Sequence, residues 1–333
     1  MDNAVQHWEG RIGRRLRLRD LHILSIVVQW GSMAKAASHL AMTQPAVSEA
    51  IAKLEDILRV RLLDRSPRGI EPTLYAHALL KRGHVVFDEL RQGIRDIEFL
   101  ADPTAGEVRV SSQETFAAGL LPAAIDRLSR RHPGIVVHVV QPNTATLEFR
   151  ELRERSVDVV LARMPRSIVS EEVDVEMLFD DPSFVVAGSQ SRWARRRKIT
   201  LGELVNEPWI FSANQPFGAM IDEAFKAQGL EVPRKRVSAG SMLLRSRLLA
   251  TGRFLTTLPD SVLRYNAKQW SLKVLPVDLG VKPRAIAIVT LKNRTVNPVV
   301  QLFVEHLRAV AKTMFAPSGP GRDARGKLMD TKA

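Results

Sequence analysis

The sequence of 333 residues contains no cysteine, and this absence removes several kinds of chemistry. Disulfides, thiolate metal sites and cysteine nucleophiles are all excluded. The sequence also lacks a Gly-rich phosphate-binding loop and a His-Glu-x-x-His zinc helix, and its eight histidines are scattered. No pair of carboxylates and no Ser/His/Asp order indicates catalysis. We therefore expect a protein that binds without turnover, with no catalytic residues, no metal and no cofactor.

Long apolar runs are absent as well, and residues 1–20 are charged rather than apolar. The sequence therefore predicts neither a membrane span nor a signal peptide, and we expect a soluble, cytoplasmic protein. Charge of one sign is plentiful instead, because the formal net charge is +13. Such an excess favours a polyanionic partner. The basic run at residues 195–198 is interpreted as a solvated loop.

Residues 31–55 predict two short helices joined by a tight turn. Ser32 and Thr43 are good N-cap residues, because each hydroxyl can accept from an N–H group of the first helical turn. In the second helix, apolar residues recur with the spacing of one buried stripe, namely Val47, Ala50, Ile51 and Leu54. The opposite face presents Gln44, Pro45, Ser48, Glu49 and Lys53. This face suits base edges in a major groove, or is merely the solvated side of an ordinary helix pair.

Residues 60–73 favour the first of these interpretations, because they predict two short strands around a Ser-Pro-Arg-Gly turn. Such a hairpin is a wing, and it places Arg65 and Arg68 at a tip where phosphates can be met. Guanidinium groups pair well with phosphate oxygens, and these contacts fix register without reading sequence.

Residues 16–75 resemble the winged helix-turn-helix of LysR-type transcriptional regulators. The matching positions are Ala36, Ala37, Leu40, Thr43, Gln44, Pro45, Ala46, Val47, Ser48, Ile51, Leu54, Glu55, Arg65, Pro72 and Thr73. The resemblance implies base-facing roles for Gln44, Pro45, Ser48 and Glu49. It implies phosphate contacts for Ser32, Thr43, Lys53, Arg65 and Arg68.

The sequence departs from the family pattern at four places. Arg59 or Val60 stands where the family usually has glycine, Leu63 where it has phenylalanine, and Ala76 where it often has glycine. Glu49 replaces a basic or amide residue; its carboxylate would repel phosphate and can accept from a cytosine amino group. The stretch 65–69, with the Arg-rich start of the first helix, is similar to family members of the galactose-binding-protein regulator type. This similarity hints at a sugar or organic acid as effector.

Residues 76–103 predict a long linker helix followed by a hinge. Apolar residues alternate at three and four positions, and the seam for dimerisation consists of Leu80, Phe87, Leu90, Ile94 and Ile97. One helix cannot bury this seam against itself, so it pairs with a second chain or packs on the chain's own effector domain. The resemblance implies a homodimer or homotetramer with paired reading heads on an interrupted palindrome of double-stranded DNA.

Residues 104–316 predict strands alternating with helices, an α/β pattern expected to give a parallel, doubly wound sheet. The resemblance implies a two-lobed effector domain, similar to type 2 periplasmic binding proteins. We expect lobe I at 104–165 and 268–316, lobe II at 166–267, and crossings near residues 165–169 and 265–270. Residues 1–15 are expected to form a polar extension, and residues 317–333 a disordered tail.

Ligands of open α/β sheets bind beyond the carboxyl ends of the strands, where helix N-termini offer free N–H groups. Polar residues at such positions are the expected effector contacts: Ser112, Thr115, Gln141, Asn143, Arg163, Asn214 and Ser241. Each has a plainer explanation, since Ser, Thr and Asn also cap helices and Arg163 can pair with a surface carboxylate.

These patterns together predict a sequence-specific transcriptional regulator that is controlled by a small molecule between two lobes and that acts on RNA polymerase. A cytoplasmic solute-binding or enzymatic domain fused to a DNA-binding module is the alternative.

Overall fold

The computed structural model describes residues 15–66, 69–141, 149–164, 171–212, 217–233 and 236–315. The predicted extension, apart from Arg15, and the predicted tail lie outside these residues. The chain divides into two compact units, residues 1–91 and 92–333, which are described one at a time. Within the described ranges, no helix combines the length and the apolar character that a membrane span requires.

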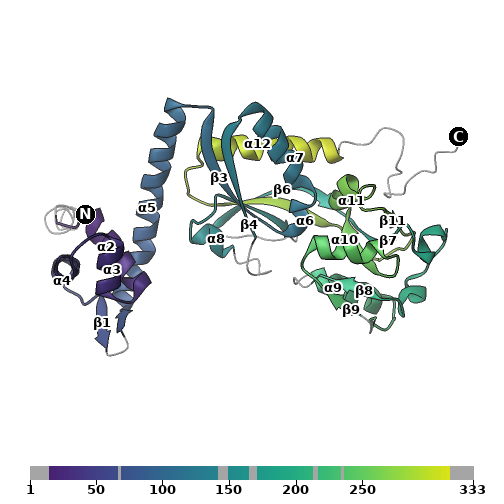
Figure 1. Cartoon of the computed structure of the whole chain (residues 1–333), viewed down its shortest axis with the longest axis horizontal. Coiled ribbons are helices and arrows are strands. Elements are labelled where there is room, and N and C mark those ends of the chain that lie inside the picture. Colours follow the sequence, from purple (N-terminus) through teal and green to yellow (C-terminus); the bar gives the residue numbers. More distant parts are fainter. Residues whose placement is uncertain are drawn as a thin grey trace. The chain divides into compact units, whose positions relative to one another are not determined.

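Three short helices form the core of the first unit: α2 (Leu18–Trp30), α3 (Met33–His39) and α4 (Gln44–Leu58) (Figure 1). Gly31 ends α2 in the left-handed region, with φ of 60°, which glycine adopts without steric cost. The apolar faces of the helices meet in one cluster that includes Leu24, Val27, Ala36, Val47, Ile51 and Leu54. The predicted helix pair is confirmed.

The wing follows as two antiparallel strands, β1 (Leu63–Ser66) and β2 (Gly69–Pro72), with Arg65 opposite Ile70. The Glu55 carboxylate on α4 accepts from the backbone N–H groups of Leu62 and Leu63, at 2.7 and 3.2 Å. A side chain of α4 therefore sets where the first wing strand begins. Glu55 is one of the residues that match the LysR family pattern, and these two hydrogen bonds give a physical reason for a glutamate at this position.

One continuous helix, α5 (Leu74–Ala101), runs through the boundary between the two units. The Thr73 hydroxyl lies just before it, accepts from the N–H of Ala76 at 3.3 Å and donates to the carbonyl of Arg61 at 2.8 Å. Thr73 thus caps α5 and ties its start to the wing. The helix begins two residues before the predicted position 76.

The second unit contains two five-stranded sheets. The first has the order β4–β3–β5–β12–β6, formed by Gly134–Val140, Ala105–Ser112, Val159–Met164, Arg284–Leu291 and Val173–Asp181. The second has the order β11–β7–β10–β8–β9, formed by Leu272–Val274, Ser183–Gly188, Leu255–Pro259, Trp209–Phe211 and Arg236–Ser238.

Both sheets are mixed, so the expectation of parallel sheets was wrong. In the first, β3 pairs in parallel with β4 and β5, whereas β12 is antiparallel to β5 and β6. In the second, β8 is parallel to β9 and β10, whereas β7 is antiparallel to β10 and β11. Antiparallel strands arise where the chain enters or leaves a lobe, and no local pattern of residues marks this reversal.

Helices cover the sheets. The long α12 (Pro298–Phe315) and α7 (Leu120–Arg131) pack together with the first sheet in one apolar cluster (Figure 1). The shorter elements there are α6 (Glu114–Ala117) and α8 (Arg150–Arg153). The second sheet is accompanied by η2 (Arg192–Arg195), η3 (Leu201–Leu204), α9 (Phe217–Ala227), α10 (Met242–Ala250) and α11 (Asp260–Asn266).

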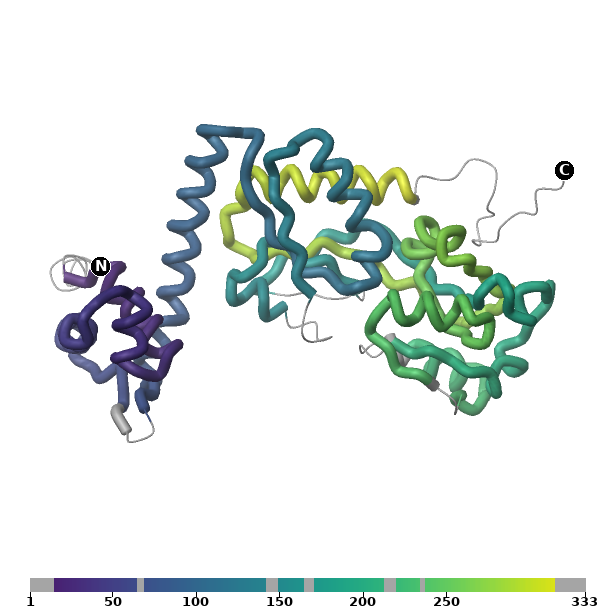
Figure 2. Tube along the Cα trace, in the orientation of Figure 1, coloured from purple at the N-terminus to yellow at the C-terminus, as the bar shows by residue number. Residues whose placement is uncertain are grey.

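The two lobes are present, but their boundaries differ from the predicted ones. Lobe I, built on the first sheet, combines blue and yellow stretches of the chain in Figure 2. It includes β6, which was expected in lobe II, so the first crossing lies at Pro182 rather than near residues 165–169. Strand β11 belongs to lobe II, so the second crossing follows residue 274 instead of lying at 265–270. Edge strands such as β6 and β11 carry charged residues on a solvated side, which hides them from a search for apolar runs.

Candidate DNA interface and effector cleft

Helix α4 separates its buried and exposed faces as its sequence predicts. Val47, Ile51 and Leu54 are buried, whereas the opposite face presents the exposed side chains of Gln44, Pro45, Glu49 and Lys53 and the half-buried Ser48. Pro45 occupies the first turn, where its missing N–H group leaves no bond unmade. The exposed surface of this helix is therefore mainly polar and carries no large apolar side chain, as expected of a face that reads base edges.

Two of the expected phosphate contacts serve as helix caps. The Ser32 hydroxyl accepts from the N–H of Lys35, and the Thr43 hydroxyl accepts from the N–H of Ala46, both at 3.4 Å. Each cap leaves the hydroxyl proton available to a phosphate oxygen. Arg65 lies on strand β1, while its side chain and the whole of Arg68 fall outside the described residues.

The seam of α5 divides into a buried and an exposed part. Leu80 is buried in the core of the first unit, and Phe87 is half-buried with its ring edge-on to His22 at 5.9 Å. Other apolar side chains of the helix are exposed: Val86, Leu90, Ile94, Ile97 and Leu100. The structure therefore assigns Leu80 to packing within the chain, while the exposed stripe has the apolar character of an interface.

In the second unit, several predicted effector residues gather at the carboxyl ends of β3 and β5. Ser112 is fully buried and its hydroxyl donates to the carbonyl of Gln113 at 3.2 Å. The hydroxyl oxygen of Thr115 on α6 is buried and has no hydrogen-bond partner among the described residues. Such an orphan hydroxyl is a suitable ligand contact, because a bound polar group would satisfy it.

The other predicted contacts are less informative. Gln141 is exposed directly after β4, and Asn143 and Asn214 lie outside the described residues. Ser241 is exposed and caps α10 by accepting from the N–H of Leu244 at 3.3 Å. The plain explanation of Ser241 as a cap is thus confirmed, and its contact with an effector stays a prediction.

Arg163 is engaged in a buried ion pair at the point where the lobes join. Its Nη1 lies 2.7 Å from Oδ2 of Asp181, the last residue of β6, and both side chains are almost completely buried. The Asp181 carboxylate also accepts from the hydroxyl and the N–H of Ser261 in lobe II, at 2.6 and 3.0 Å. Burial lowers the pKa of the Arg163 guanidinium below its usual value, and the attraction of Asp181 opposes this shift.

The guanidinium of Arg163 also lies over the ring of Phe116, at 5.1 Å from the centroid. The ring covers a charge that water does not reach, so Arg163 acts first as the structural partner of Asp181. The sequence suggested a surface carboxylate as the partner of Arg163, whereas its partner Asp181 is buried and lies 18 residues further along the chain.

Arg245 on α10 is a second buried arginine, which the sequence analysis did not single out. Its guanidinium donates to the Thr256 hydroxyl at 2.7 Å and to the Thr257 carbonyl at 2.8 Å. Burial lowers the pKa of Arg245 to about 10, while the charge of Glu114 opposes the shift, so the group stays protonated at neutral pH. A single arginine in a helix gives no sign in the sequence that it will be buried.

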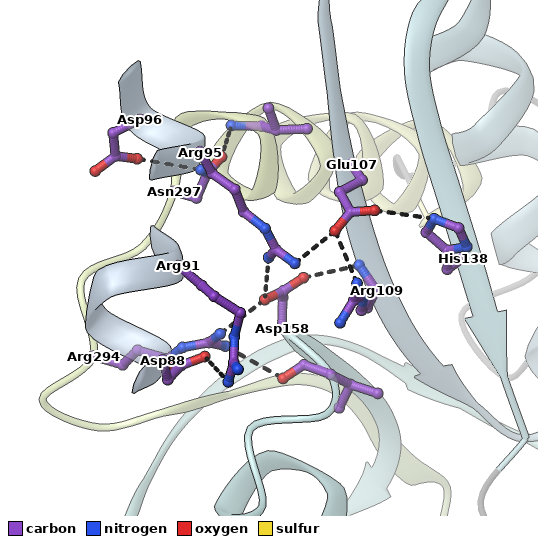
Figure 3. A network of polar contacts seen from close by, with 12 residues as sticks. Asp88, Arg91, Arg95, Asp96, Glu107, Arg109, His138, Asp158, Arg294 and Asn297 are labelled. Atoms are coloured by element: carbon purple, nitrogen blue, oxygen red, sulfur yellow. Dashed lines mark hydrogen bonds and ion pairs between the residues drawn. The ribbon is translucent and has the colours of Figure 1, made fainter. Parts of the chain in front are cut away.

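A further polar network ties the end of α5 to lobe I (Figure 3). The guanidinium of Arg95 lies between Glu107 of β3 and Asp158, with nitrogen–oxygen distances of 2.6 and 3.7 Å. The buried Asp158 carboxylate also accepts from the N–H of Arg109 at 2.9 Å and lies 3.1 Å from the Arg294 guanidinium. Residues from distant parts of the sequence therefore fix the last turns of α5 onto this lobe.

The comparisons with protein families agree with this geometry. Residues 18–77 match the model of the bacterial regulatory helix-turn-helix protein, lysR family, and residues 101–312 match the LysR substrate binding domain. The chain therefore belongs to the LysR family of bacterial transcriptional regulators. It is a DNA-binding regulator with an effector-binding domain, in a family whose members are not enzymes.

Individual relatives are distant. The HTH-type transcriptional regulator GbpR of Azospirillum brasilense is 25% identical over 304 residues, which cover 90% of this chain and 88% of the relative. A full-length OxyR variant from Pseudomonas aeruginosa shares the fold with a TM-score of 0.61 and 20% identity, over 92% of this chain and 99% of OxyR. Full-length CbnR, solved with its target DNA, gives a TM-score of 0.60 at 21% identity, over 89% of this chain and all of CbnR.

Proposed function

We propose that this regulator binds an interrupted palindrome as a homodimer or homotetramer and that a small molecule between lobes I and II controls it. The exposed polar face of α4 carries the first part of this proposal, because its opposite face is committed to the core. Gln44, Pro45, Ser48 and Glu49 face bases, while Ser32, Thr43, Lys53, Arg65 and Arg68 contact phosphates. The solved complex of CbnR with its target DNA supports the use of this fold on DNA.

The exposed stripe of α5 supports pairing of chains. Leu90, Ile94 and Ile97 lie along one exposed side of a 28-residue helix, and burial against a second chain would remove this apolar surface from water. Two reading heads on one dimer then match two half-sites of DNA. A change in lobe packing reaches α5 through the network of Arg95, Glu107 and Asp158, and so alters what the promoter-bound protein presents to RNA polymerase.

The effector is proposed to be a sugar or an organic acid. The orphan hydroxyl of Thr115 can donate to a hydroxyl or a carboxylate group of the effector. The Ser112 hydroxyl, which gives its proton to the Gln113 carbonyl, can accept from an effector hydroxyl. The similarity to GbpR, at 25% identity, is weak support for a regulator of that type and does not name the ligand. Effector binding that shifts the lobes then changes the affinity or geometry of DNA binding by linkage.

The test of base readout is selection of fragmented genomic DNA on the purified protein, followed by sequencing of the retained fragments. We expect the wild type to recover one interrupted palindrome and Gln44→Ala to lose part of that preference. Gln29→Ala, on the exposed end of α2, is the matched control. Recovery of the same motif by Gln44→Ala would refute the base-reading role.

The test of phosphate contact uses salt dependence. Arg68→Ala should weaken binding to all sequences similarly and lower the slope of log affinity against log salt by about one unit. Arg131→Ala, an exposed arginine at the end of α7, should leave this slope unchanged. An unchanged slope in Arg68→Ala would contradict the placement of Arg68 at a phosphate.

A further inference from the structure

A carboxylate of lobe I occupies the beginning of a helix in lobe II. The Glu114 side chain, in the first turn of α6, accepts from the backbone N–H of Met242 at 2.8 Å. Met242 is the first residue of α10, and 128 residues separate the two partners. Because Ser241 caps the N–H of Leu244, the Met242 bond adds a second oxygen to the same helix start.

The surroundings of this carboxylate are positive. The N-terminus of α10 carries the positive end of the helix dipole. Arg245, one turn further along, is only 4% exposed and is attracted electrostatically to Glu114. Its Nε is buried and makes no hydrogen bond among the described residues. The Arg245 guanidinium also reaches the side chain of Met242, with Nη1 3.5 Å from Sδ, so the start of α10 is an anion position beside a buried positive charge. Glu114 fills this position from the other lobe.

Two other contacts between the lobes are made by buried side chains. The Asn266 side-chain amide donates to the carbonyl of Ala118, and Ser261 binds Asp181; Asn266, Ser261 and Asp181 are all buried. Glu114, by contrast, is half-buried, so part of this residue is exposed to solvent. A further contact with an accessible side chain joins the Arg264 guanidinium of lobe II to the carbonyl of Met314 in lobe I at 2.6 Å, but it contains no carboxylate that a solute anion could replace.

We propose that Glu114 is an internal carboxylate ligand that latches the two lobes and that an effector carboxylate displaces it from the start of α10. The proposal rests on the proposed function of the cleft and assigns the effector to the organic acids. When an effector carboxylate replaces that of Glu114, the buried positive charge of Arg245 still has a negative charge nearby. The hydrogen bond between Glu114 of α6 and Met242 of α10 is then broken, so the two helices are no longer linked by it. Loss of that bond changes how the lobes pack, which is the step that effector control requires.

The test is chemical rescue with acetate, followed by hydrogen exchange of the peptide that contains the start of α10. In Glu114→Ala, we expect exchange at residues 242–246 to be faster by about tenfold or more, because hydrogen bonds to charged groups are the stronger ones. Excess sodium acetate should restore the protection, whereas sodium chloride of the same concentration should not. Glu114→Gln keeps the shape and an acceptor oxygen and should give intermediate protection.

Two controls separate the latch from general effects. Glu305→Ala removes an exposed carboxylate from α12 and should change neither exchange at α10 nor its response to acetate. The wild type should respond weakly to acetate, since a tethered carboxylate competes at a high effective concentration. Unchanged exchange in Glu114→Ala would overturn the latch, and rescue by chloride as good as by acetate would overturn the assignment of this position to a carboxylate.

A second measurement follows the lobes themselves. The absence of cysteine allows Ser129→Cys in lobe I and Lys226→Cys in lobe II to be labelled as a pair for distance measurement. Glu114→Ala should broaden or lengthen the distance distribution, and acetate should return it toward that of the wild type. A distribution identical to the wild type would overturn the latch. Neither readout involves DNA, so a failure here is distinguishable from a failure of the proposed regulator function.

Discussion

Asp181→Asn is the substitution for which the structure predicts the largest loss of stability at nearly constant shape. The side chain of Asp181 has no exposed surface, and that of its partner Arg163 is 2% exposed. Asparagine retains one oxygen that can accept from Ser261, but it removes the charge that balances the buried guanidinium. Breaking one partner of a buried ion pair costs about 3–5 kcal/mol, because the remaining charge is left without compensation.

The expected loss in free energy of unfolding is measured by urea denaturation of the full chain. Tryptophan fluorescence and circular dichroism serve as the signals that monitor unfolding. Trp209 is fully buried in lobe II and reports on the lobe that Asp181 joins through Ser261. Asp126→Asn is the matched control, since Asp126 forms an exposed ion pair with Arg130 at 3.0 Å. Exposed pairs contribute about 0–1 kcal/mol, so this control should unfold almost like the wild type.

The double substitution Arg163→Met with Asp181→Asn tests the reasoning further. It removes both charges together and should recover part of the stability that Asp181→Asn loses, because a buried pair is often replaceable by apolar groups. The explanation would be refuted if Asp181→Asn cost no more than Asp126→Asn. It would also be refuted if the double substitution were as unstable as the sum of the single ones.

Three more outcomes are expected. A Cβ on Gly188 would lie 2.1 Å from the carbonyl oxygen of Leu249, so Gly188→Ala should lower the free energy of unfolding by about 2 kcal/mol or more in urea denaturation. Arg59 ends α4 in the left-handed region at φ 56°, so Arg59→Gly should raise the stability of the first unit by about 0.5–1 kcal/mol; a loss would contradict strain there. Ile97 is 68% exposed on α5, so Ile97→Glu should shift the oligomer toward monomer in sedimentation analysis, while exposed Glu98→Gln should not.

Local signals in the sequence predicted the DNA-binding unit almost completely. Ser32, Thr43 and Pro45 mark the helix starts, and the spacing of Val47, Ile51 and Leu54 marks the buried face. These features act within a few residues along the chain, since caps and stripes depend on neighbours one helical turn away. A departure from the family's usual glycine at Arg59 or Val60 was also visible in the sequence. The structure shows that Arg59 is the residue with left-handed backbone, a conformation that favours glycine.

The pairing of strands that are distant in the sequence could not be predicted for the second unit from such local signals. Strand β6 joins the sheet of lobe I only because β12, more than a hundred residues later, provides its antiparallel partner. Its charged residues made it resemble a loop, since an edge strand needs only one apolar side. Both crossings between the lobes were displaced for this reason.

The sequence by itself determined the order of elements, the reading helix, the wing, the linker helix and the presence of two α/β lobes. Only the tertiary structure decided the partners of the buried charges. Arg163 forms an ion pair with Asp181, and Asp158 forms ion pairs with the guanidinium groups of Arg95 and Arg294. The Glu114 carboxylate accepts a hydrogen bond at the start of α10. The physical reason is that a cap or an apolar stripe is complete within one turn of helix. A buried charge takes its partner from whichever segment the fold brings beside it, and that choice follows from the packing of the whole lobe.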